Sequence, residues 1–541
     1  MSVRVLDCTL RDGGYYNSWR FSDDLVADYL SAVSRAGVDF VEIGFRNFPQ
    51  PSFVGPYAYS TDAFLETLPI PDDLNIGVMI DAKTVLTTPD DPVSAVDKLF
   101  SHRDQSRASL VRIAAHFDEV VHCRPVVDRL KSLGYLVGLN IMQMAGRETA
   151  LVSELAATVE SWGAVDMLYF ADSLGSMDAA EVDRITAAMR DGWNGSLGIH
   201  AHNNKSLAVQ NSLHAMSLGI EYLDATILGM GRGAGNADLG ILLAELTHRD
   251  VRPADLIGVY SVGVKHFQPL KDEYRWGPNL FYHYSALNNI HPMFAQTLLS
   301  DQRYGPEEQF SVIESLAAFE ARSFDKSRVD QLLNPFDVQP GDGTDVEPAD
   351  LHDLTGATVL IVGAGGSAKT YAKDIRLFIE QHNPTVLTLN HQASIDIELV
   401  DGIICVDQHR LAYETDFLAT CGKPVFTAQR LLSPSVKERL ENADLHQYDC
   451  ILEADSFAAH DGGCVVPVPL AFGYALALCI SAKVKRIFLV GFDGFSPDDS
   501  RQQQMLQLLR LAEPHQSDLA MTALTPTNYP ISQGSLYADY R

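Results

Sequence analysis

Two short polar stretches, each following an apolar run, carry residue types that could hold a divalent cation. The first contains Arg11 and Asp12, and the second, residues 198–204, contains His200 and His202. A carboxylate is a preferred ligand of hard divalent cations. A guanidinium beside that cation can stabilise an oxyanion. The two stretches therefore predict a metal centre next to a positively charged side chain, against the alternative of a surface ion pair.

The spacing of the two histidines supports this prediction. Residues two apart in an extended strand point to the same side, so His200 and His202 could reach one ion from a strand over residues 196–203. An Asp/His/His set leaves coordination positions open for water and substrate. The alternative is a pair of histidines packed in an apolar interior. Asn203 and Asn204 follow, and could orient the ligands.

A glycine-rich stretch at residues 229–236 ends in Asn236, a further candidate ligand. Glycines allow the backbone to approach a bound molecule closely. A merely flexible loop is the alternative reading of the same pattern.

The elements that must position these residues repeat regularly between residues 3 and 247. A short apolar run is followed each time by a segment with helical periodicity, such as residues 23–35, 150–162 and 206–218. The predicted strands are residues 4–10, 40–46, 75–81, 110–116, 136–143, 165–172, 196–203 and 222–229. Eight such units predict an α/β protein with a (β/α)8 (TIM) barrel, and an open doubly wound sheet is the alternative.

Polar residues gather where these predicted strands end. In a (β/α)8 barrel the carboxyl ends of the strands form one rim, and catalysis takes place there. The residues at these ends are Arg11, Asp12, Arg46, Asp81, His116, Gln143, Asp172, Ser173, His200, His202 and Asn236. Incidental surface residues would be spread over both ends, so the pattern indicates an enzyme.

Four motifs carry a resemblance to a known family: residues 9–13 (TLRDG), 171–175 (ADSLG), 200–204 (HAHNN) and 229–236 (GMGRGAGN). Over roughly residues 1–300 the chain resembles the DRE-TIM metallolyase superfamily. That superfamily includes hydroxymethylglutaryl-CoA lyase, isopropylmalate synthase and 4-hydroxy-2-oxovalerate aldolase. The resemblance implies a lyase that binds Mn²⁺ or Mg²⁺ and acts on a 2-oxo acid such as pyruvate through a metal-bound enolate.

The resemblance also implies roles for individual residues. Asp12, His200 and His202 would be metal ligands, with Asn236 as a candidate fourth. Arg11 would stabilise the enolate, and the residues expected to contact substrate are Ser173, Arg46 and His116. The partners would be two small molecules, a 2-oxo acid and an aldehyde.

Three departures from the patterns of the family members bear on the chemistry. The aldolases place a catalytic histidine where this chain has Tyr15, so the general base is open among Tyr15, Tyr16 and His291. Residues 229–236 contain no cysteine, unlike the lyase loop, and the Glu and Gln of the acyl-CoA condensing enzymes are also missing. These differences favour an aldolase. An acyl-CoA-dependent Claisen condensing enzyme is the alternative.

The chain divides by composition into a barrel (residues 1–250), a helical extension (251–333), a linker rich in Pro, Gly and acids (334–354) and a second α/β unit (355–541). The second unit opens with an apolar strand, 358–362, and a G-x-G-x-x-A turn of the kind that binds dinucleotides. The acidic residue expected about twenty positions further on is absent, so NAD is not favoured.

This second unit, predicted to be Rossmann-like, weakly resembles domains of flagellin-modifying Maf proteins and bacterial sialyltransferases. The resemblance implies a nucleotide or nucleotide-sugar as ligand, and a role in surface carbohydrate biosynthesis. The candidate contacts are Gly363, Gly365, Ser367, Asn390, Asp407 and Asp493. The alternatives are a turn that only packs helix against sheet, and a glycosyltransferase-like protein whose barrel is a scaffold.

Charge and cysteine content narrow the remaining function classes. The 541 residues include 70 acids and 41 Lys or Arg, a net charge of −29, so we expect neither nucleic acid nor a membrane as partner. The seven cysteines form no C-x-x-C pair, and the N-terminus has no leader-like segment, so we expect a cytoplasmic protein. Barrels of the resembled family often associate, which implies a homo-oligomer, a dimer in the simplest case.

Overall fold

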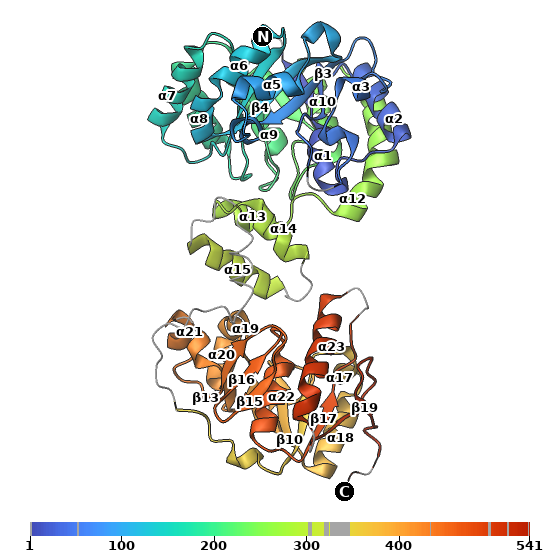
Figure 1. Ribbon diagram of the computed structural model, residues 1–541, viewed down its shortest axis with the longest axis vertical. Helices are drawn as coiled ribbons and strands as arrows, with labels where there is room; N and C mark the ends of the chain where they lie inside the picture. The colour runs from blue at the N-terminus through green and yellow to red at the C-terminus, as the bar shows by residue number, and fades with distance from the viewer. Residues whose placement is uncertain are drawn as a thin grey trace. The chain divides into compact units, whose positions relative to one another are not determined.

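The computed structural model describes residues 3–50, 53–300, 306–318, 324, 347–432, 434–495, 499–516, 519–538 and 540. The chain forms two compact units, residues 1–300 with 316–324, and residues 301–315 with 325–541 (Figure 1). Most of the predicted linker, residues 334–346, lies outside the described residues, as does part of the predicted extension. No helix among the residues described is long and apolar enough to cross a membrane.

The first unit is a closed barrel of parallel strands in sequence order, as predicted. The strands are β1 (Arg4–Asp7), β2 (Phe40–Phe45), β3 (Asn75–Asp81), β4 (Ala108–His116), β5 (Leu136–Met142), β6 (Met167–Ala171), β7 (Ser196–His200) and β8 (Tyr222–Ala225). Strand β1 closes the barrel by pairing with β8, with Leu6 opposite Asp224. The helices cover the outside of the sheet (Figure 1).

The barrel helices are α1 (Thr9–Asn17), α2 (Asp23–Arg35), α3 (Asp62–Leu65), α4 (Ala82–Leu86), α5 (Pro92–Leu99), α6 (Arg124–Ser132), α7 (Thr149–Glu160), α8 (Ala179–Gly192), α9 (Ala208–Ser217) and α10 (Leu239–His248). Helix α2 shows why they form: Leu25, Val26, Tyr29 and Val33 are buried on one face. Apolar residues at this spacing cover a sheet while the other face stays in water. Burial on both faces explains why the strands read as near-continuous apolar runs.

Strand β1 ends three residues earlier than predicted, and this changes where the key residues lie. The Asp7 carboxylate accepts hydrogen bonds from the Thr9 backbone N–H at 2.8 Å and the Thr9 hydroxyl at 2.9 Å. Such a side-chain turn stops a strand and starts a helix. Arg11 and Asp12 therefore stand on the first turn of α1, directly above the barrel, and not on a strand.

Helices follow the barrel as expected, and their bounds are α11 (Leu256–Val262), α12 (Gln268–Tyr274), α13 (Leu280–Leu287), α14 (Pro292–Ser300) and α15 (Pro306–Ala318). The short turn between α13 and α14 carries His291.

The second unit contains a parallel eight-stranded sheet in the order β13-β12-β11-β10-β9-β17-β18-β19. These strands are β9 (Thr358–Val362), β10 (Thr385–Leu389), β11 (Gly402–Ile404), β12 (Val425–Thr427), β13 (Leu445–Gln447), β17 (Arg486–Val490), β18 (Ala520–Ala523) and β19 (Ser532–Gln533). Strands β9, β10 and β17 have the predicted bounds. The order reverses between β9 and β17, which is where doubly wound sheets bind ligands.

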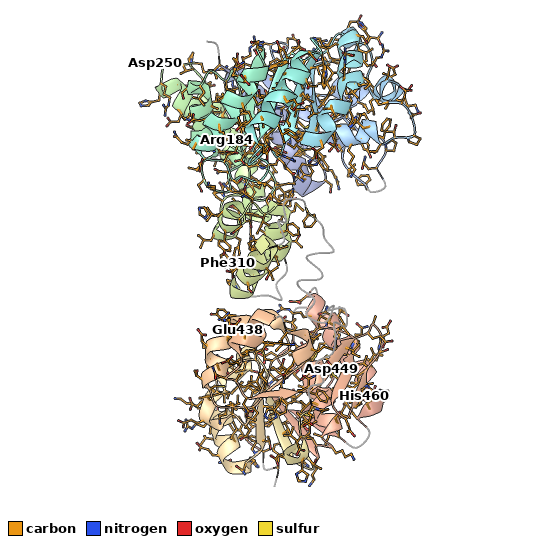
Figure 2. All side chains as sticks on the ribbon, turned by 90° about the vertical axis from the view of Figure 1, so that its left-hand side faces the viewer. Arg184, Asp250, Phe310, Glu438, Asp449 and His460 are labelled. Carbon is orange, nitrogen blue, oxygen red and sulfur yellow. The ribbon has the colours of Figure 1, made fainter. Side chains whose placement is uncertain are left out.

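A smaller sheet, β14-β16-β15, stands apart from the large one. It consists of β14 (Asp449–Leu452), β15 (Ala458–His460) and β16 (Gly463–Val466), and Asp449 and His460 mark it in Figure 2. The strand predicted at residues 450–453 belongs here. The helices of this unit are α17 (Gly366–Thr370), α18 (Ala372–His382), α19 (Gln408–Tyr413), α20 (Thr415–Thr420), α21 (Pro434–Arg439), α22 (Ala471–Ser481) and α23 (Ser500–Ala512).

The predicted phosphate turn after β9 is filled by a side chain of the protein itself. Asp493, on the loop after β17, accepts a hydrogen bond from the Ser367 backbone N–H at 2.8 Å and another from the Ser367 hydroxyl. A side chain on Gly365 would lie 2.6 Å from the Gly491 carbonyl oxygen, so the glycine allows the two loops to pack. At the position where a phosphate was predicted, the turn therefore binds the Asp493 carboxylate.

Asn390 and Asp407 follow β10 and β11, at the same edge of the sheet as the turn, because all these strands are parallel. The Asp407 carboxylate accepts a hydrogen bond from the Arg410 backbone N–H at 3.0 Å. Gly363 continues β9 and donates its N–H to the Val490 carbonyl oxygen at 2.9 Å.

Replacement of Asp493 by alanine should lower the stability of the second unit by about 1–3 kcal/mol, because Ser367 loses a charged acceptor. Asp493→Asn keeps one acceptor oxygen and should lose less. Urea unfolding monitored by circular dichroism measures both, and the exposed turn residue Asp461, changed to alanine, is the matched control. Equal midpoints for Asp493→Ala and this control would contradict the bridging role.

Candidate active site

A cavity of about 250 Å³ opens at the carboxyl ends of the barrel strands. The predicted rim and site residues that line it are Arg11, Asp12, Tyr15, Asp81, His116, Gln143, Ser173, His200, His202 and His291. Residues that the sequence analysis did not assign also line it, among them Arg232 and Asn140. Most of the rim that was predicted from the strand ends therefore surrounds one common space, but Asp172, Asn236 and Arg46 are not among the lining residues.

Arg46 is the predicted substrate contact that the structure does not bring to this cavity. Its guanidinium is buried, donates to the carbonyl oxygens of Ser60 at 2.8 Å and Leu99 at 2.9 Å, and pairs with Asp62. These contacts tie the segment after β2 to the barrel. The prediction was wrong because position at a strand end does not show which way a long side chain turns.

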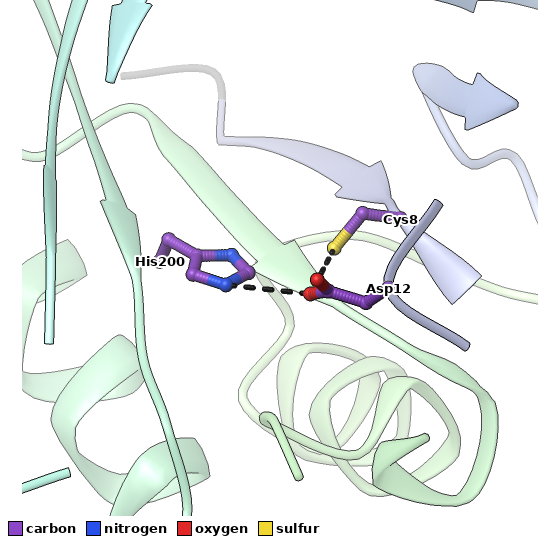
Figure 3. Close-up of side chains that lie close together, drawn as sticks. All are labelled: Cys8, Asp12 and His200. Carbon is purple, nitrogen blue, oxygen red and sulfur yellow. Dashed lines mark hydrogen bonds and ion pairs between the residues drawn. The ribbon is translucent and has the colours of Figure 1, made fainter. Parts of the chain in front are cut away.

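Asp12 lies at the centre of a tight cluster of candidate ligand atoms (Figure 3). Its Oδ2 is 3.4 Å from His200 Nε2 and 3.9 Å from Cys8 Sγ. One ligand atom from each of the three residues lies within 4.8 Å of the others. Burial raises the pKa of the Cys8 thiol well above its usual value, and sulfur is a soft ligand that hard divalent cations do not prefer. Asp12 and His200 are therefore the groups suited to a hard divalent cation.

Each histidine is oriented through its Nδ1 atom. His200 Nδ1 is 2.9 Å from Asp224 Oδ2, and His202 Nδ1 is 3.3 Å from the Ser173 carbonyl oxygen. Both rings therefore keep Nε2 for a ligand, which is how metal-binding histidines are usually held. The ring centroids are 5.1 Å apart.

Asn203 and Asn204 do not orient the histidines, contrary to the prediction. Asn203 Oδ1 accepts the Ala208 backbone N–H at 3.2 Å, at the start of α9. Asn204 packs against Gly175, where a side chain would lie 2.1 Å from Asn204 Oδ1. Both asparagines stabilise the turn after β7.

Asn236 lies beside the cluster but turns its amide nitrogen toward it. Its Nδ2 donates to Asp12 Oδ2 at 2.8 Å and to the Met230 carbonyl oxygen at 3.2 Å. A backbone bridge links Asn236 to His202, so the glycine-rich loop and the histidines share one rim. In this arrangement Asn236 positions the carboxylate, and its role as a fourth ligand stays a prediction.

The ionisation states suit a cation. Burial alone would raise the pKa of Asp12, but Arg11, followed by the two histidines and Arg232, lowers it to about 2. Burial, with His200 next in importance, lowers the pKa of His202 to about 3. At neutral pH Asp12 is a carboxylate and His202 a neutral imidazole, the forms that bind metal.

Three charged residues that the sequence analysis missed support the cluster from inside the barrel. Arg11 Nε is 2.6 Å from Glu42 Oε1, and Arg112 Nε is 2.6 Å from Glu42 Oε2. Arg112 Nη1 in turn lies 2.7 Å from Asp224 Oδ2. All of these side chains are almost completely buried.

These contacts close into a ring. Asp224 holds His200, His200 lies against Asp12, and Asp12 pairs with Arg11. The ring contains two guanidinium groups and three carboxylates, so it carries one surplus negative charge when the imidazole is neutral. A divalent cation beside Asp12 would offset that charge, which supports a metal at this position.

A sequence signal for the missed residues did exist. Glu42, Arg112 and Asp224 each stand within an otherwise apolar strand, as in Phe-Val-Glu-Ile over residues 40–43. An isolated charge in a fully buried strand needs a partner of opposite charge. A charged residue inside an apolar strand therefore predicts a buried ion pair, whereas a polar residue at the end of a strand predicts only a place at the rim.

One nitrogen of the Arg11 guanidinium has no hydrogen-bond partner. Its Nε and Nη1 are taken by Glu42 and Asp12, whereas the buried Nη2 has no hydrogen-bond partner in the structure. A buried donor without a partner is costly unless a ligand completes it. Because Arg11 lines the cavity beside Asp12, Nη2 is suited to bind an anionic oxygen.

The candidate proton-transfer residues differ in their surroundings. Tyr15 packs against Trp19 and Phe45, with ring centroids 4.8 and 6.1 Å away. His291 Nδ1 accepts the Met293 backbone N–H at 3.3 Å, so the proton of the neutral ring is on Nε2. Tyr16 does not line the cavity, and burial raises its pKa to about 12.

Replacement of Arg112 by methionine should destabilise the barrel by about 3–5 kcal/mol, because Glu42 and Asp224 would remain buried without their partner. Arg129→Met is the matched control, since Arg129 forms a partly exposed pair with Asp97 that is worth no more than about 1 kcal/mol. Thermal and urea unfolding measure both. Equal losses in the two variants would contradict the structural role of the ring.

Comparisons with known proteins agree with this geometry. The HMGL-like family model matches residues 102–262. A 4-hydroxy-2-oxovalerate aldolase from Pelotomaculum thermopropionicum is 32% identical over 249 residues, which are 45% of this chain and 70% of that protein. An oxaloacetate decarboxylase from Mycobacterium tuberculosis is 28% identical over 247 residues, again 45% of this chain and 70% of the relative.

A solved structure is also similar. The N-terminal domain of a putative aldolase from Bacteroides vulgatus is 30% identical, covers 55% of this chain and 97% of its own, and superposes with a TM-score of 0.51. The residues that the family model matches, 102–262, lie in the unit that holds the cavity and the charged ring. On this identity and coverage, the chain belongs to the HMGL-like family.

Proposed function

We propose that this protein is a divalent-metal-dependent aldolase that makes or breaks the bond between C3 and C4 of a 2-oxo acid. Family membership supports a lyase-type enzyme. The substrates in the names of both relatives are 2-oxo acids. The pyruvate type of substrate that the sequence motifs imply agrees with these names.

The observation that carries the proposal is the unpartnered Arg11 Nη2 next to Asp12. When the C3–C4 bond of a 2-oxo acid breaks, C3 becomes part of an enolate and negative charge develops on the keto oxygen at C2. A buried donor that is already fixed by Glu42 and Asp12 can stabilise that charge without reorganising. The ring of charges therefore fixes the Arg11 guanidinium in a position where it can stabilise negative charge in the transition state.

Asp12, His200 and His202 would hold the cation. When bound there, a divalent cation supplies positive charge to the carboxylate and keto oxygens of the substrate. Asp224 and the Ser173 carbonyl oxygen keep both Nε2 atoms available, and Asn236 fixes Asp12.

His291 is suited to hydrogen-bond to the substrate oxygen derived from the aldehyde. Burial, with Arg232 next in importance, lowers its pKa to about 4, so the ring is neutral at pH 7. With Nδ1 engaged by Met293, the ring presents Nε2–H, which can donate a hydrogen bond to the aldehyde oxygen as that oxygen gains negative charge during addition. In the cleavage direction the same N–H donates to the hydroxyl oxygen of the substrate.

Decarboxylation is a second candidate, favoured by the similarity to an oxaloacetate decarboxylase. Loss of CO₂ from oxaloacetate places the same negative charge beside Arg11, and needs no group that serves an aldehyde. The ratio of turnover on oxaloacetate to turnover on 4-hydroxy-2-oxo acids separates the two activities. An acyl-CoA-dependent condensation would instead release free CoA.

Binding of a nucleotide or nucleotide-sugar by the second unit, with a role in surface carbohydrate synthesis, stays a proposal from the sequence. It requires a binding mode other than phosphate on the glycine turn, because Asp493 occupies the Ser367 N–H there.

In the presence of Mn²⁺ the protein should exchange the methyl protons of pyruvate with solvent deuterium, and Asp12→Ala should lower that rate at least 100-fold. The reason is that Asp12 both holds the cation and fixes Arg11. NMR of pyruvate in D₂O measures the exchange, and EDTA should abolish it. Asp104→Ala, which removes an exposed carboxylate remote from the cavity, is the control. Exchange that persists without metal would refute the proposal.

His291→Asn should lower the rate of aldol addition and cleavage about 100-fold or more, the usual effect of losing a hydrogen-bond donor to an oxygen that gains charge. Tyr15→Phe keeps the ring and its packing and should change the rate much less. Steady-state assays with pyruvate and an aldehyde measure both variants. A larger loss in Tyr15→Phe would assign proton transfer to the tyrosine hydroxyl.

A further inference from the structure

Arg232 is the one residue of the glycine-rich loop, residues 229–236, that places a charge at the cavity. Its side chain is exposed, yet it lines the cavity together with His202 and His291. The neighbouring glycines, Gly231 and Gly233, contribute no side chains that would cover it.

The guanidinium of Arg232 is held by an aromatic ring and has no acidic partner. It lies over the ring of Tyr15, 4.0 Å from the centroid. In the part of the chain that the structure describes, no carboxylate forms an ion pair with Arg232, whereas Arg11 has two such partners. Stacking uses the face of the guanidinium and leaves the N–H groups at its edge for another ligand.

The Tyr15 ring is itself held in place by its neighbours, so it is a firm support for the Arg232 guanidinium. Its ring packs edge-on against Trp19 and Phe45. A side chain on Gly14 would lie 2.0 Å from Trp19, so the close packing of this aromatic group depends on that glycine. The platform under Arg232 is therefore part of α1, the helix that also carries Asp12.

An unpaired arginine is notable on this protein, whose net charge is −29. The overall charge repels anions, so an anionic substrate needs a local positive field to enter the cavity. The charge of Arg232 acts within the cavity, since it contributes to the lowered pKa values of Asp12 and His291. Arg11, which would face the reacting end of the 2-oxo acid, is buried, whereas Arg232 lines the same cavity with an exposed side chain.

We propose that Arg232 binds an anionic group, a carboxylate or a phosphate, carried by the aldehyde substrate away from its reacting carbonyl. This inference rests on the proposed aldolase function, and names the class of its second substrate. An arginine edge binds both anions in a bidentate manner, which sets the orientation of the bound molecule. A cavity of about 250 Å³ suits a small molecule with two charged ends.

The test compares matched aldehydes in aldol addition to pyruvate by the wild-type full-length protein. Succinic semialdehyde against butyraldehyde tests a carboxylate, and glyceraldehyde 3-phosphate against glyceraldehyde tests a phosphate. We expect kcat/KM to favour the anionic member of at least one pair by tenfold or more. The pair with the larger ratio identifies the anion.

Arg232→Met should lower that ratio about tenfold or more, and Arg232→Lys, which keeps the charge without the flat edge, should lie between. A ratio cancels any general loss of activity. Arg249→Met, which removes an exposed arginine of the same unit, is the control for net charge and should leave the ratio unchanged. Tyr15→Ala, but not Tyr15→Phe, should lower the ratio, because only the alanine removes the platform.

The outcomes separate this inference from the proposed function. A wild-type protein that exchanges pyruvate protons but favours neither anionic aldehyde would overturn the inference and leave the aldolase intact. A ratio unchanged in Arg232→Met would also overturn it. Absence of metal-dependent exchange in the wild type would refute the aldolase, and this inference with it.

Discussion

The closed ring of buried charges inside the barrel is the interaction on which the rest of the site depends. Buried ions are stable only when paired, so Glu42 and Asp224 fix Arg112, and through it they fix the groups at the rim. The ring fixes the orientation of the His200 imidazole and of the Arg11 guanidinium, whose Nη2 has no hydrogen-bond partner. Both side chains line the same cavity. The charged groups at the cavity are therefore held in place by ion pairs with charges that are buried inside the barrel.

The need to pair buried polar and charged groups has a different result in the second unit. At the point where the strand order reverses, Asp493 satisfies the N–H group that a phosphate would otherwise bind. In the barrel an unpaired donor and a surplus negative charge face an open cavity. Of two loops that follow parallel strands, one therefore has its N–H group satisfied by a carboxylate of the protein, whereas the other lies beside the Arg11 Nη2 atom, which has no hydrogen-bond partner.

Much of the fold was predictable from the sequence, because strand and helix periodicity are local properties. The eight strands of the barrel and the strands β9, β10 and β17 lie in the apolar runs that predicted them, although β7 and β8 end three and four residues earlier than predicted, so His202 follows β7 and does not belong to it. The end of β1 was not predictable in this way, because the turn depends on the Asp7 carboxylate bonding to Thr9. Short edge strands such as β19 have too few apolar residues to give a signal.

The sequence by itself determined the barrel and which residue types meet at its rim, because the carboxyl ends of parallel strands must share one side. Only the tertiary structure decided their orientation and partners. The Arg46 side chain contacts Ser60 and not the cavity, the Asn236 amide nitrogen donates to Asp12, and the Arg232 guanidinium stacks on the Tyr15 ring. These outcomes depend on contacts between residues far apart in the chain, and spacing within one strand or loop carries no information about them.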